Sequence, residues 1–204
     1  MLATFKLRQL IEQPEIIVAP GAYDCLTAKI IQQTGFPAVY MTGAGTSVAR
    51  YGFPDLALAS MTEMISNAAD ITASVSVPVI ADADTGYGGL LNVGRTVRKY
   101  EQSGVAAIHI EDQEFPKRCG HLDDKRVIPT EDMIPKIKEA VEEVFPNHVV
   151  ERMDLDTTRT KSGYRNLINK FENRQIDILV GTQMVSKGLD FDNVTLVGVI
   201  LADN

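Results

Sequence analysis

Apolar runs alternate with amphipathic segments along nearly the whole chain. Compact apolar runs, typical of strands buried in a parallel sheet, occupy residues 15–20, 38–42, 77–83, 106–111, 148–153, 176–180 and 194–201. Segments with helical spacing occupy residues 5–13, 25–34, 60–74, 92–102, 130–144 and 162–173. This alternation predicts an α/β fold with a parallel sheet of about seven strands. The sheet would be open, or a TIM-type (β/α) barrel one strand short of completion.

The length and composition fit one α/β domain. The chain has 204 residues, of which 45% are hydrophobic and 23% charged, enough for a substantial core. The net charge of −7 argues against a nucleic-acid surface built on bulk positive charge. The first residues lack the apolar core of a secretory signal, and no apolar run is long enough to span a bilayer. Two cysteines make no disulfide framework, so we predict a cytoplasmic protein without membrane association.

Two carboxylates end the third predicted strand and precede a glycine-rich turn. Asp82 and Asp84 stand two residues apart in DADTGYGG (82–89), so an extended strand would point both to one face. Adjacent anions repel each other unless a cation joins them, and a hard divalent ion is the usual solution. The alternative is a polar strand end whose aspartates cap the next helix.

More polar residues are expected at the same edge, because ligands bind at the carboxyl ends of parallel strands. His109 and Glu111 end the fourth strand, and Asp55 lies between the second and third strands. With Asp82 and Asp84, the carboxylates would form an all-oxygen cluster that suits Mg²⁺ or Mn²⁺ better than zinc. Taken singly, Asp55 or Glu111 would be an ordinary solvated carboxylate.

The second predicted strand contributes Tyr40 and is followed by a turn of small residues, TGAGTS (42–47). Successive backbone N–H groups in such a turn could hold a carboxylate.

A long loop carries the second candidate for chemistry, PKRCGH (116–121). Lys117, Arg118 and His121 surround Cys119 with positive charge, which favours the thiolate and makes proton transfer feasible near neutral pH. Gly120 would let the loop close over a site. The alternative is a surface cysteine among solvated charges.

Five motifs, in order, resemble those of the isocitrate lyase/phosphoenolpyruvate mutase superfamily across residues 18–142. They are PGAYD (20–24), YMTGA (40–44), DADTGYG (82–88), IEDQ (110–113) and KRCGH (117–121). The K-x-C-G-H form of the loop is more similar to the carbon–carbon lyases, such as methylisocitrate lyase, than to the phosphonomutases. The resemblance implies a Mg²⁺-dependent retro-aldol cleavage of a 2-hydroxy carboxylic acid to pyruvate, with the metal stabilising a pyruvate enolate.

The same resemblance implies a role for each candidate residue. The implied metal site is Asp82, supported directly or through water by Asp84, Glu111 and Asp55. The implied substrate-binding residues are Thr42, Gly43, Ala44, His109 and Gly120. The implied catalytic residues are Cys119, Lys117, His121 and Tyr40, with Cys119 handling the proton on the departing carboxylate fragment. Tyr40 would also help Thr42 and its neighbours to hold the keto-acid portion.

After about residue 142 a different resemblance begins. Residues 144–204, above all GTQMVSKGLDF (181–191), look like part of the second RecA-like lobe of the primosomal replication helicase. The chain has no G-x-x-x-x-G-K-[ST] phosphate loop, so we expect no helicase or ATPase activity. We interpret the chain as a chimera of an N-terminal lyase half-barrel (1–143) and a helicase-like βαβ segment (144–204) that ends within its domain. We expect the strands of both parts to form one sheet.

Three functions stay open at this level. The first is the lyase, with a small carboxylic acid as substrate and its activity either kept or lost. The second is an inactive chimeric scaffold that still binds metal and keto acid. The third, a nucleic-acid-binding helicase fragment, is disfavoured because residues 144–204 are not basic overall. The superfamily resemblance also suggests a homo-oligomer, although the chain lacks the C-terminal helices that members exchange.

Overall fold

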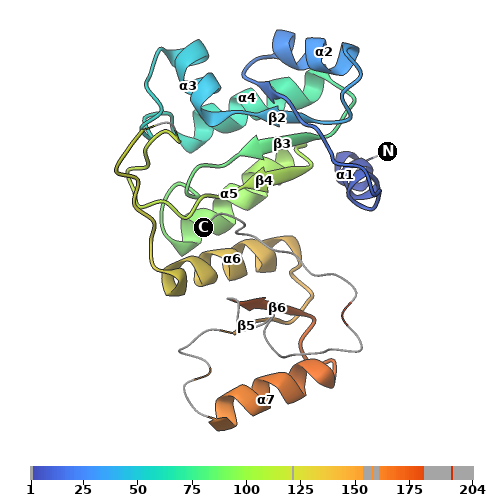
Figure 1. The fold of residues 1–204 in the computed structure, drawn as a ribbon, viewed down its shortest axis with the longest axis vertical. Coiled ribbons are helices and arrows are strands. Elements are labelled where there is room, and N and C mark those ends of the chain that lie inside the picture. Colours follow the sequence, from blue (N-terminus) through green and yellow to red (C-terminus); the bar gives the residue numbers. More distant parts are fainter. Residues whose placement is uncertain (1, 121, 154–157, 159–160, 182–193, 195–204) are drawn as a thin grey trace. The chain divides into compact units, whose positions relative to one another are not determined.

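The computed structural model describes residues 2–120, 122–153, 158, 161–181 and 194 (Figure 1). Two compact units divide the chain, Met1–Pro129 and Thr130–Asn204. Both contain helices and parallel strands, which confirms the predicted α/β class. The division precedes the helix at 130–144, whereas the sequence placed the boundary at its end. The described strands form a four-stranded sheet in the first unit and a two-stranded sheet in the second. That the strands of both units belong to one sheet stays a prediction.

The first unit contains a four-stranded parallel sheet and its helices. In chain order the elements are α1 (Ala3–Ile11), β1 (Gly21–Ala22), α2 (Cys25–Gln33), β2 (Val39–Met41), α3 (Gly43–Tyr51), α4 (Met61–Ser74), β3 (Val79–Asp82), α5 (Leu90–Gln102) and β4 (Ala107–His109). The strands lie side by side in the order β1-β2-β3-β4, with Met41 opposite Ala81 and Asp82 opposite His109. Neighbouring parallel strands joined through helices are the repeating unit of a (β/α) barrel.

The core of this unit lies between the sheet and the helices α2, α4 and α5, which contact β1 and β2, β3, and β4 respectively (Figure 1). The buried strand residues on this face are Ala22, Val39, Met41, Val79 and Ala81. Because successive strand residues point to opposite faces, Tyr40, Asp82 and His109 project from the other face of the sheet. The packing of the core therefore fixes which face can carry chemistry.

Side-chain caps set the start of two helices where the sequence predicts them. Asp24 accepts a hydrogen bond of 2.8 Å from the backbone N–H of Thr27 and caps α2. Ser60 and Glu63 form the same reciprocal arrangement at the start of α4. Gly35 follows α2 with φ +95°, the left-handed conformation that closes many helices.

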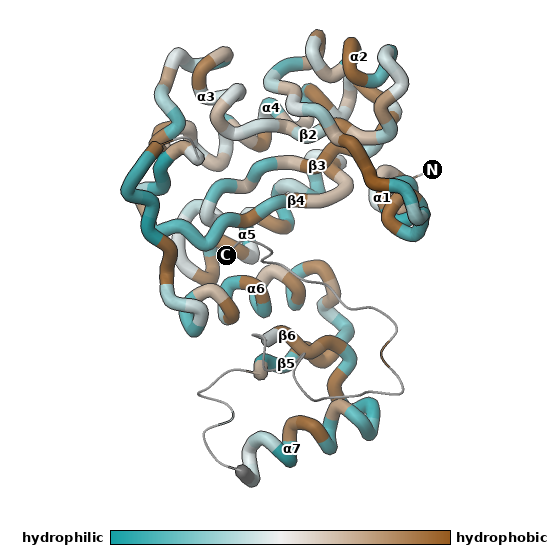
Figure 2. Tube along the Cα trace, viewed as in Figure 1, coloured by the Kyte–Doolittle hydropathy of each residue, from teal (hydrophilic) through white to brown (hydrophobic). Residues whose placement is uncertain are grey.

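The predicted strand at residues 15–20 is wrong. The sheet begins only at β1, and the Pro20 carbonyl accepts from Tyr40 N–H at its border. Ile16 is 90% exposed and Val18 52% exposed, so this run is not buried as a parallel strand would be. Figure 2 shows the hydrophobic segment between α1 and β1. An apolar run forms a strand only where a neighbouring strand can satisfy its backbone, and none is paired with this run among the described residues.

The second unit contains α6 (Thr130–Val144), β5 (Val150–Met153), α7 (Lys161–Glu172) and β6 (Ile178–Gly181). β5 and β6 pair in parallel, with Val150 opposite Ile178, and α6 packs on both strands through Ile134. The predicted strand at 194–201 lies outside the described residues apart from Val194, so six strands can be compared with the seven predicted. Within the described part of the chain, no helix has the length and apolarity to cross a bilayer.

Candidate active site

The carboxylate of Asp82 is fixed by two backbone donors at the end of β3. Its Oδ1 accepts from the N–H of Asp84 at 2.8 Å, and its Oδ2 accepts from the N–H of Gly43 at 3.1 Å. The residue is only 7% exposed. A Cβ atom at position 43 would overlap Asp82 Oδ2, so the close approach of β3 to the start of α3 requires glycine there.

The predicted turn at residues 42–47 is instead the first part of α3. Thr42 caps this helix by accepting from Gly45 N–H at 3.0 Å, and Gly43 begins it. The sequence predicts that the backbone N–H groups of this turn could hold a carboxylate. In the structure the N–H of Gly43 donates to a carboxylate of the protein itself, that of Asp82. Partial positive charge at a helix N-terminus favours an anion at this position.

Asp84 does not share a strand face with Asp82, as the i, i+2 spacing suggested. β3 ends at Asp82, and Asp84 has φ +55°, a left-handed conformation outside a strand. Its carbonyl accepts from the N–H of Glu111 at 2.7 Å, which ties the turn to the end of β4. Burial raises the pKa of the Asp84 carboxyl to about 6, an effect that the charge of Lys117 partly offsets and that of Asp82 increases.

Lys117 places a buried cation among these carboxylates. Its Nζ lies 3.1 Å from Asp55 Oδ1 and 3.2 Å from Asp84 Oδ1, and its side chain is 4% exposed. Burial alone would lower the pKa of this amine, but Asp82, Asp84, Asp55 and Glu111 together raise it above its usual value. Lys117 therefore remains an ammonium ion that joins the loop after β4 to the segments after α3 and β3.

Gln113 links Glu111 to the same loop, a contact that the sequence did not single out. Its Nε2 donates to Glu111 Oε2 at 2.6 Å, and its Oε1 accepts from the N–H of Arg118 at 3.1 Å. The side-chain amide thus connects the end of β4 with the residue before Cys119. Its position within the IEDQ motif was the available signal, but only the fold reveals the contact.

Tyr40 and His109 meet on the open face of the sheet. The Tyr40 hydroxyl lies 3.1 Å from His109 Nδ1, and the two share a hydrogen bond whose direction depends on the histidine tautomer. Burial, with the nearby charges of Asp82 and Glu111, raises the pKa of Tyr40 well above its usual value. Tyr40 therefore keeps its proton at neutral pH and can orient or donate to a ligand rather than act as a base.

Two of the candidate residues that follow Lys117, Cys119 and Gly120, belong to the described part of the loop. Cys119 is a half-buried thiol, and Gly120 is exposed with its carbonyl accepting from Lys125 Nζ at 2.6 Å. Ala44, in the first turn of α3, is also half-buried. His121 lies outside the described residues.

The donor set fits a hard cation held by few protein ligands. Asp84 Oδ1 is buried and accepts no hydrogen bond from the described residues, although it lies within ion-pair distance of Lys117. Among these residues, no three His, Cys, Asp or Glu side chains are grouped closely enough to hold an ion by themselves. The expected cluster of four therefore does not form a direct coordination shell. Mg²⁺ commonly uses one or two carboxylates and completes its shell with water, which these oxygen donors allow.

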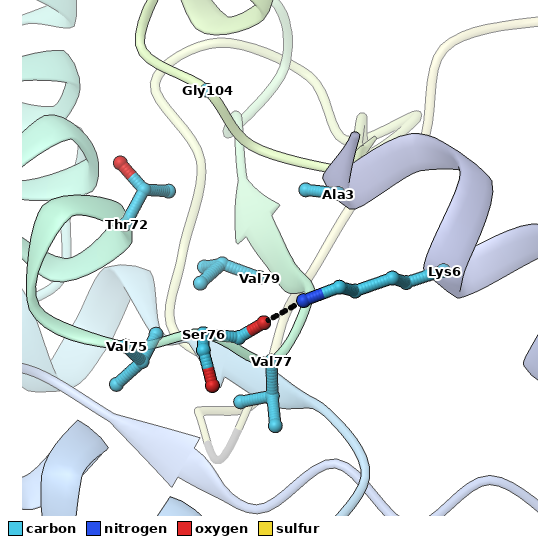
Figure 3. Close-up of a pocket in the computed structure, with 8 residues that line it drawn as sticks. All are labelled: Ala3, Lys6, Thr72, Val75, Ser76, Val77, Val79 and Gly104. Atoms are coloured by element: carbon cyan, nitrogen blue, oxygen red, sulfur yellow. Dashed lines mark hydrogen bonds between the residues drawn. The ribbon is translucent and has the colours of Figure 1, made fainter. Parts of the chain in front are cut away.

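A cavity of about 210 Å³ lies elsewhere, at the amino end of β3 (Figure 3). The cavity is lined by residues of α1, the end of α4, the start of β3 and the segment between them, and by Gly104. Beside it, Lys6 Nζ donates to the Ser76 carbonyl at 2.6 Å. Ligands of parallel α/β folds bind at the opposite, carboxyl ends of the strands. The cavity is therefore separate from the carboxylate site.

A family model described as phosphoenolpyruvate phosphomutase matches residues 7–169, which include every candidate site residue. The chain belongs to the phosphoenolpyruvate mutase/isocitrate lyase superfamily. The match continues past residue 143, where the sequence placed the join to a helicase-like segment. That second resemblance stays a prediction, because the relatives described below do not bear on it.

Named relatives in this superfamily include two lyases. The chain is 49% identical over 156 residues to 2,3-dimethylmalate lyase of Eubacterium barkeri, covering 76% of this chain and 54% of that protein. It is 41% identical over 149 residues to 2-methylisocitrate lyase of Shewanella oneidensis, covering 72% and 51%. The chain thus spans about half the length of these curated relatives.

Solved structures of superfamily members share the fold. Oxaloacetate acetylhydrolase in complex with 3,3-difluorooxalacetate has a TM-score of 0.69 at 39% identity, covering 88% of this chain and 63% of that one. Phosphonopyruvate hydrolase in complex with oxalate and Mg²⁺ has a TM-score of 0.64 at 28% identity, covering 89% and 63%.

Proposed function

We propose that this chain carries the site of a Mg²⁺-dependent carbon–carbon lyase that releases pyruvate from a 2-hydroxy carboxylic acid. The observation that carries the proposal is the burial of Lys117 between Asp55 and Asp84. Cys119 lies two residues farther along the same loop, so this contact anchors the thiol-bearing loop beside the carboxylates. A lyase needs such an anchor to bring an acid/base group to its substrate.

Asp82 and Asp84, supported by Glu111 and Asp55, would hold the ion. Bound there, Mg²⁺ would supply positive charge that stabilises negative charge developing on the substrate oxygens. The oxygen-only donor set supports this role, as does a superfamily structure that contains oxalate and Mg²⁺.

The reaction breaks one carbon–carbon bond beside a hydroxyl-bearing carbon. The hydroxyl passes its proton to water, from which the Cys119 thiol is later restored, and the carbon that bears this oxygen becomes the carbonyl of pyruvate. The electron pair of the broken bond passes to the other carboxylate fragment, so enolate charge develops on that fragment. The pyruvate enolate that the resemblance implied is therefore replaced by an enolate of the other fragment. Cys119 is the proposed donor of the proton that this fragment takes up.

The start of α3 would bind the keto-acid end of the substrate. Because the N–H of Gly43 already donates to Asp82, the contacts would come mainly from Ala44 and the Thr42 hydroxyl. Tyr40, which keeps its proton, would donate to the same group. In the proposed site His109 and Gly120 would contact the substrate. Lys117 and His121 would act beside Cys119 as catalytic residues.

A cleavage assay with a matched pair of cysteine variants tests the proposal. Wild-type protein with Mg²⁺ is expected to release pyruvate from 2-methylisocitrate or 2,3-dimethylmalate. Loss of the acid/base group in Cys119→Ser should lower the rate by about 100-fold or more. Cys25→Ser changes the second cysteine of the chain, which lies on α2, and should retain the wild-type rate. Absence of pyruvate release from the wild-type protein with either substrate would refute turnover.

Binding without turnover is the second candidate, because the chain spans only about half the length of its lyase relatives. Calorimetric titration with Mg²⁺ and oxalate would then show saturable binding that Asp82→Ala abolishes, while the cleavage assay stays negative. The cytoplasmic location, the homo-oligomer and the lack of strong nucleic-acid binding stay predictions.

A further inference from the structure

A pair of tyrosines holds the main-chain carbonyl of Asp82, and none of the roles above uses them. Tyr100, on α5, is fully buried, and its hydroxyl donates to Asp82 O at 2.9 Å. Tyr87, in the turn after β3, has its hydroxyl 3.2 Å from the hydroxyl of Tyr100. The two hydroxyls and the carbonyl form a chain of three groups that ends at the candidate metal ligand.

The direction of this chain follows from the donor capacity of each group. A carbonyl oxygen only accepts, so the single hydroxyl proton of Tyr100 goes to Asp82. Tyr87 must then donate its proton to the oxygen of Tyr100. Burial raises the pKa of both tyrosines well above the usual value, so both protons stay in place at neutral pH.

The backbone conformation at Tyr87 disfavours a side chain, which indicates that the tyrosine side chain makes compensating contacts. Tyr87 has φ +57°, a left-handed conformation that favours glycine, and it stands between Gly86 and Gly88, which also have positive φ. Glycine at position 87 would adopt this backbone without strain. A tyrosine is present instead, and its ring packs against the core cluster that contains Tyr100.

The chain of hydroxyls acts at the last backbone bond between β3 and β4, where the N–H of Ala83 donates to the His109 carbonyl at 2.8 Å. Asp82 is the last residue of β3, and the turn to Asp84 follows at once. The Asp82 carboxylate is held by the N–H groups of Gly43 and Asp84, and its carbonyl by Tyr100. The peptide that joins Asp82 to Ala83 is thus held at both ends, by His109 through its N–H and by Tyr100 through its carbonyl. Without the bond from Tyr100 only the N–H end stays fixed, so the peptide can tilt and both aspartate side chains move with it.

We propose that Tyr87 and Tyr100 are positioning residues that lock the Asp82 peptide and thereby hold the carboxylates of Asp82 and Asp84 in place for a divalent cation. The effect on cation binding rests on the proposed function, whereas the restraint of the Asp82 peptide does not.

Amide hydrogen exchange without metal tests the lock. In Tyr100→Phe, the amides of Gly43 and Asp84, which donate to the Asp82 carboxylate, should exchange faster than in wild type. The amide of Thr27, which donates to Asp24 in the same unit, should exchange at the wild-type rate and so exclude general loosening. Tyr51→Phe is the matched control, because it removes another tyrosine bond to a carbonyl, that of Glu63 on α4.

Calorimetric titration with Mg²⁺ tests the consequence for the metal. Groups that orient a metal ligand typically contribute 10- to 100-fold in affinity, so Tyr100→Phe should weaken binding by about 10-fold or more. Tyr87→Phe should weaken it less, since Tyr100 can still donate to Asp82. Tyr51→Phe should bind as wild type does.

The outcomes separate this inference from the proposed function. Wild-type exchange at Gly43 and Asp84 in a folded Tyr100→Phe protein would overturn the lock. Unchanged Mg²⁺ affinity in that variant, with wild type binding the ion, would overturn the positioning role. If wild type binds no Mg²⁺, the proposed function and the role toward the metal both fail, and exchange alone decides the lock. Should Tyr100→Phe not fold, the same two amides in Tyr87→Phe decide it, and wild-type exchange there overturns the proposal.

Discussion

Lys117 Nζ lies 3.1 Å from Asp55 Oδ1, with side chains that are only 4% and 11% exposed. The pair joins the loop after β4 to the segment after α3, where water screens the charges little. Asp84 Oδ1 lies 3.2 Å from the same nitrogen, so one ammonium ion serves two carboxylates. Removing one partner of such a buried group leaves the remaining charges uncompensated.

Lys117→Met should therefore destabilise the first unit strongly in the absence of Mg²⁺. The expected loss in the free energy of unfolding is about 3–5 kcal/mol, the usual cost of breaking a buried ion pair. Urea denaturation followed by circular dichroism measures it. Lys125→Met is the control, since Lys125 is exposed and, among the described residues, donates to the Gly120 carbonyl; its expected cost is within about 1 kcal/mol. Equal losses in the two variants would contradict a special role for Lys117.

Mg²⁺ should stabilise the folded protein through Asp82. At a free concentration about 100 times the dissociation constant, binding adds about 2.7 kcal/mol to the free energy of unfolding. Thermal melting should show this as a rise in Tm that EDTA reverses. Asp82→Asn should show no rise, whereas Asp123→Asn, at an exposed position of the loop after β4, should behave as wild type. A full rise in Asp82→Asn would exclude Asp82 as a ligand.

The raised pKa of Asp84 should make Mg²⁺ binding depend on pH. Burial raises this pKa to about 6, and only the ionised carboxylate binds the cation. One unit below that value, at pH 5, about a tenth of the group is ionised, so affinity should fall about 10-fold from its level at pH 7.5. Calorimetry at the two pH values measures the difference. In Asp84→Asn this contribution should vanish, and its survival there would assign the titration to another group.

Asp24 should contribute to the stability of the first unit as a helix cap. Asp24→Ala removes the acceptor for the Thr27 N–H and should cost about 1 kcal/mol, whereas Asp24→Asn should retain most of the cap. The bond from Thr27 lowers the pKa of Asp24, so this stabilisation is complete above the usual value of 3.8 and is lost as the pH falls through the lowered pKa. Urea denaturation of both variants at pH 7 and pH 3 tests both statements. A cost for Asp24→Ala that is undiminished at pH 3 would contradict them.

The helices were the most predictable part of the fold. The starts of α2 and α4 follow from Asp24 and Ser60, because a cap is a local interaction between residues three apart. The run at 15–20 shows the limit of such reasoning, since Ile16 is apolar yet 90% exposed. Whether an apolar run becomes a strand depends on a neighbouring strand, which no local window contains.

The site divides in the same way. Candidate residues could be proposed from the sequence, because parallel strands bring their carboxyl ends to one edge and the motifs fall there. Their pairing could not be read in advance. The i, i+2 spacing suggested that Asp82 and Asp84 share a strand face, yet the strand ends between them and Asp84 turns into a left-handed conformation.

The sequence by itself determined the α/β class, most helix boundaries, the superfamily and the set of acidic, cysteine and lysine residues that could act together. Only the tertiary structure decided that Gly43 and Asp84 fix the Asp82 carboxylate, that Tyr100 holds its carbonyl, and that Lys117 is the cation between Asp55 and Asp84. Periodicity and capping are set by neighbours along the chain, so they can be read in order. Contacts among residues tens of positions apart depend on where each loop leaves the sheet, which is settled only when the chain is packed.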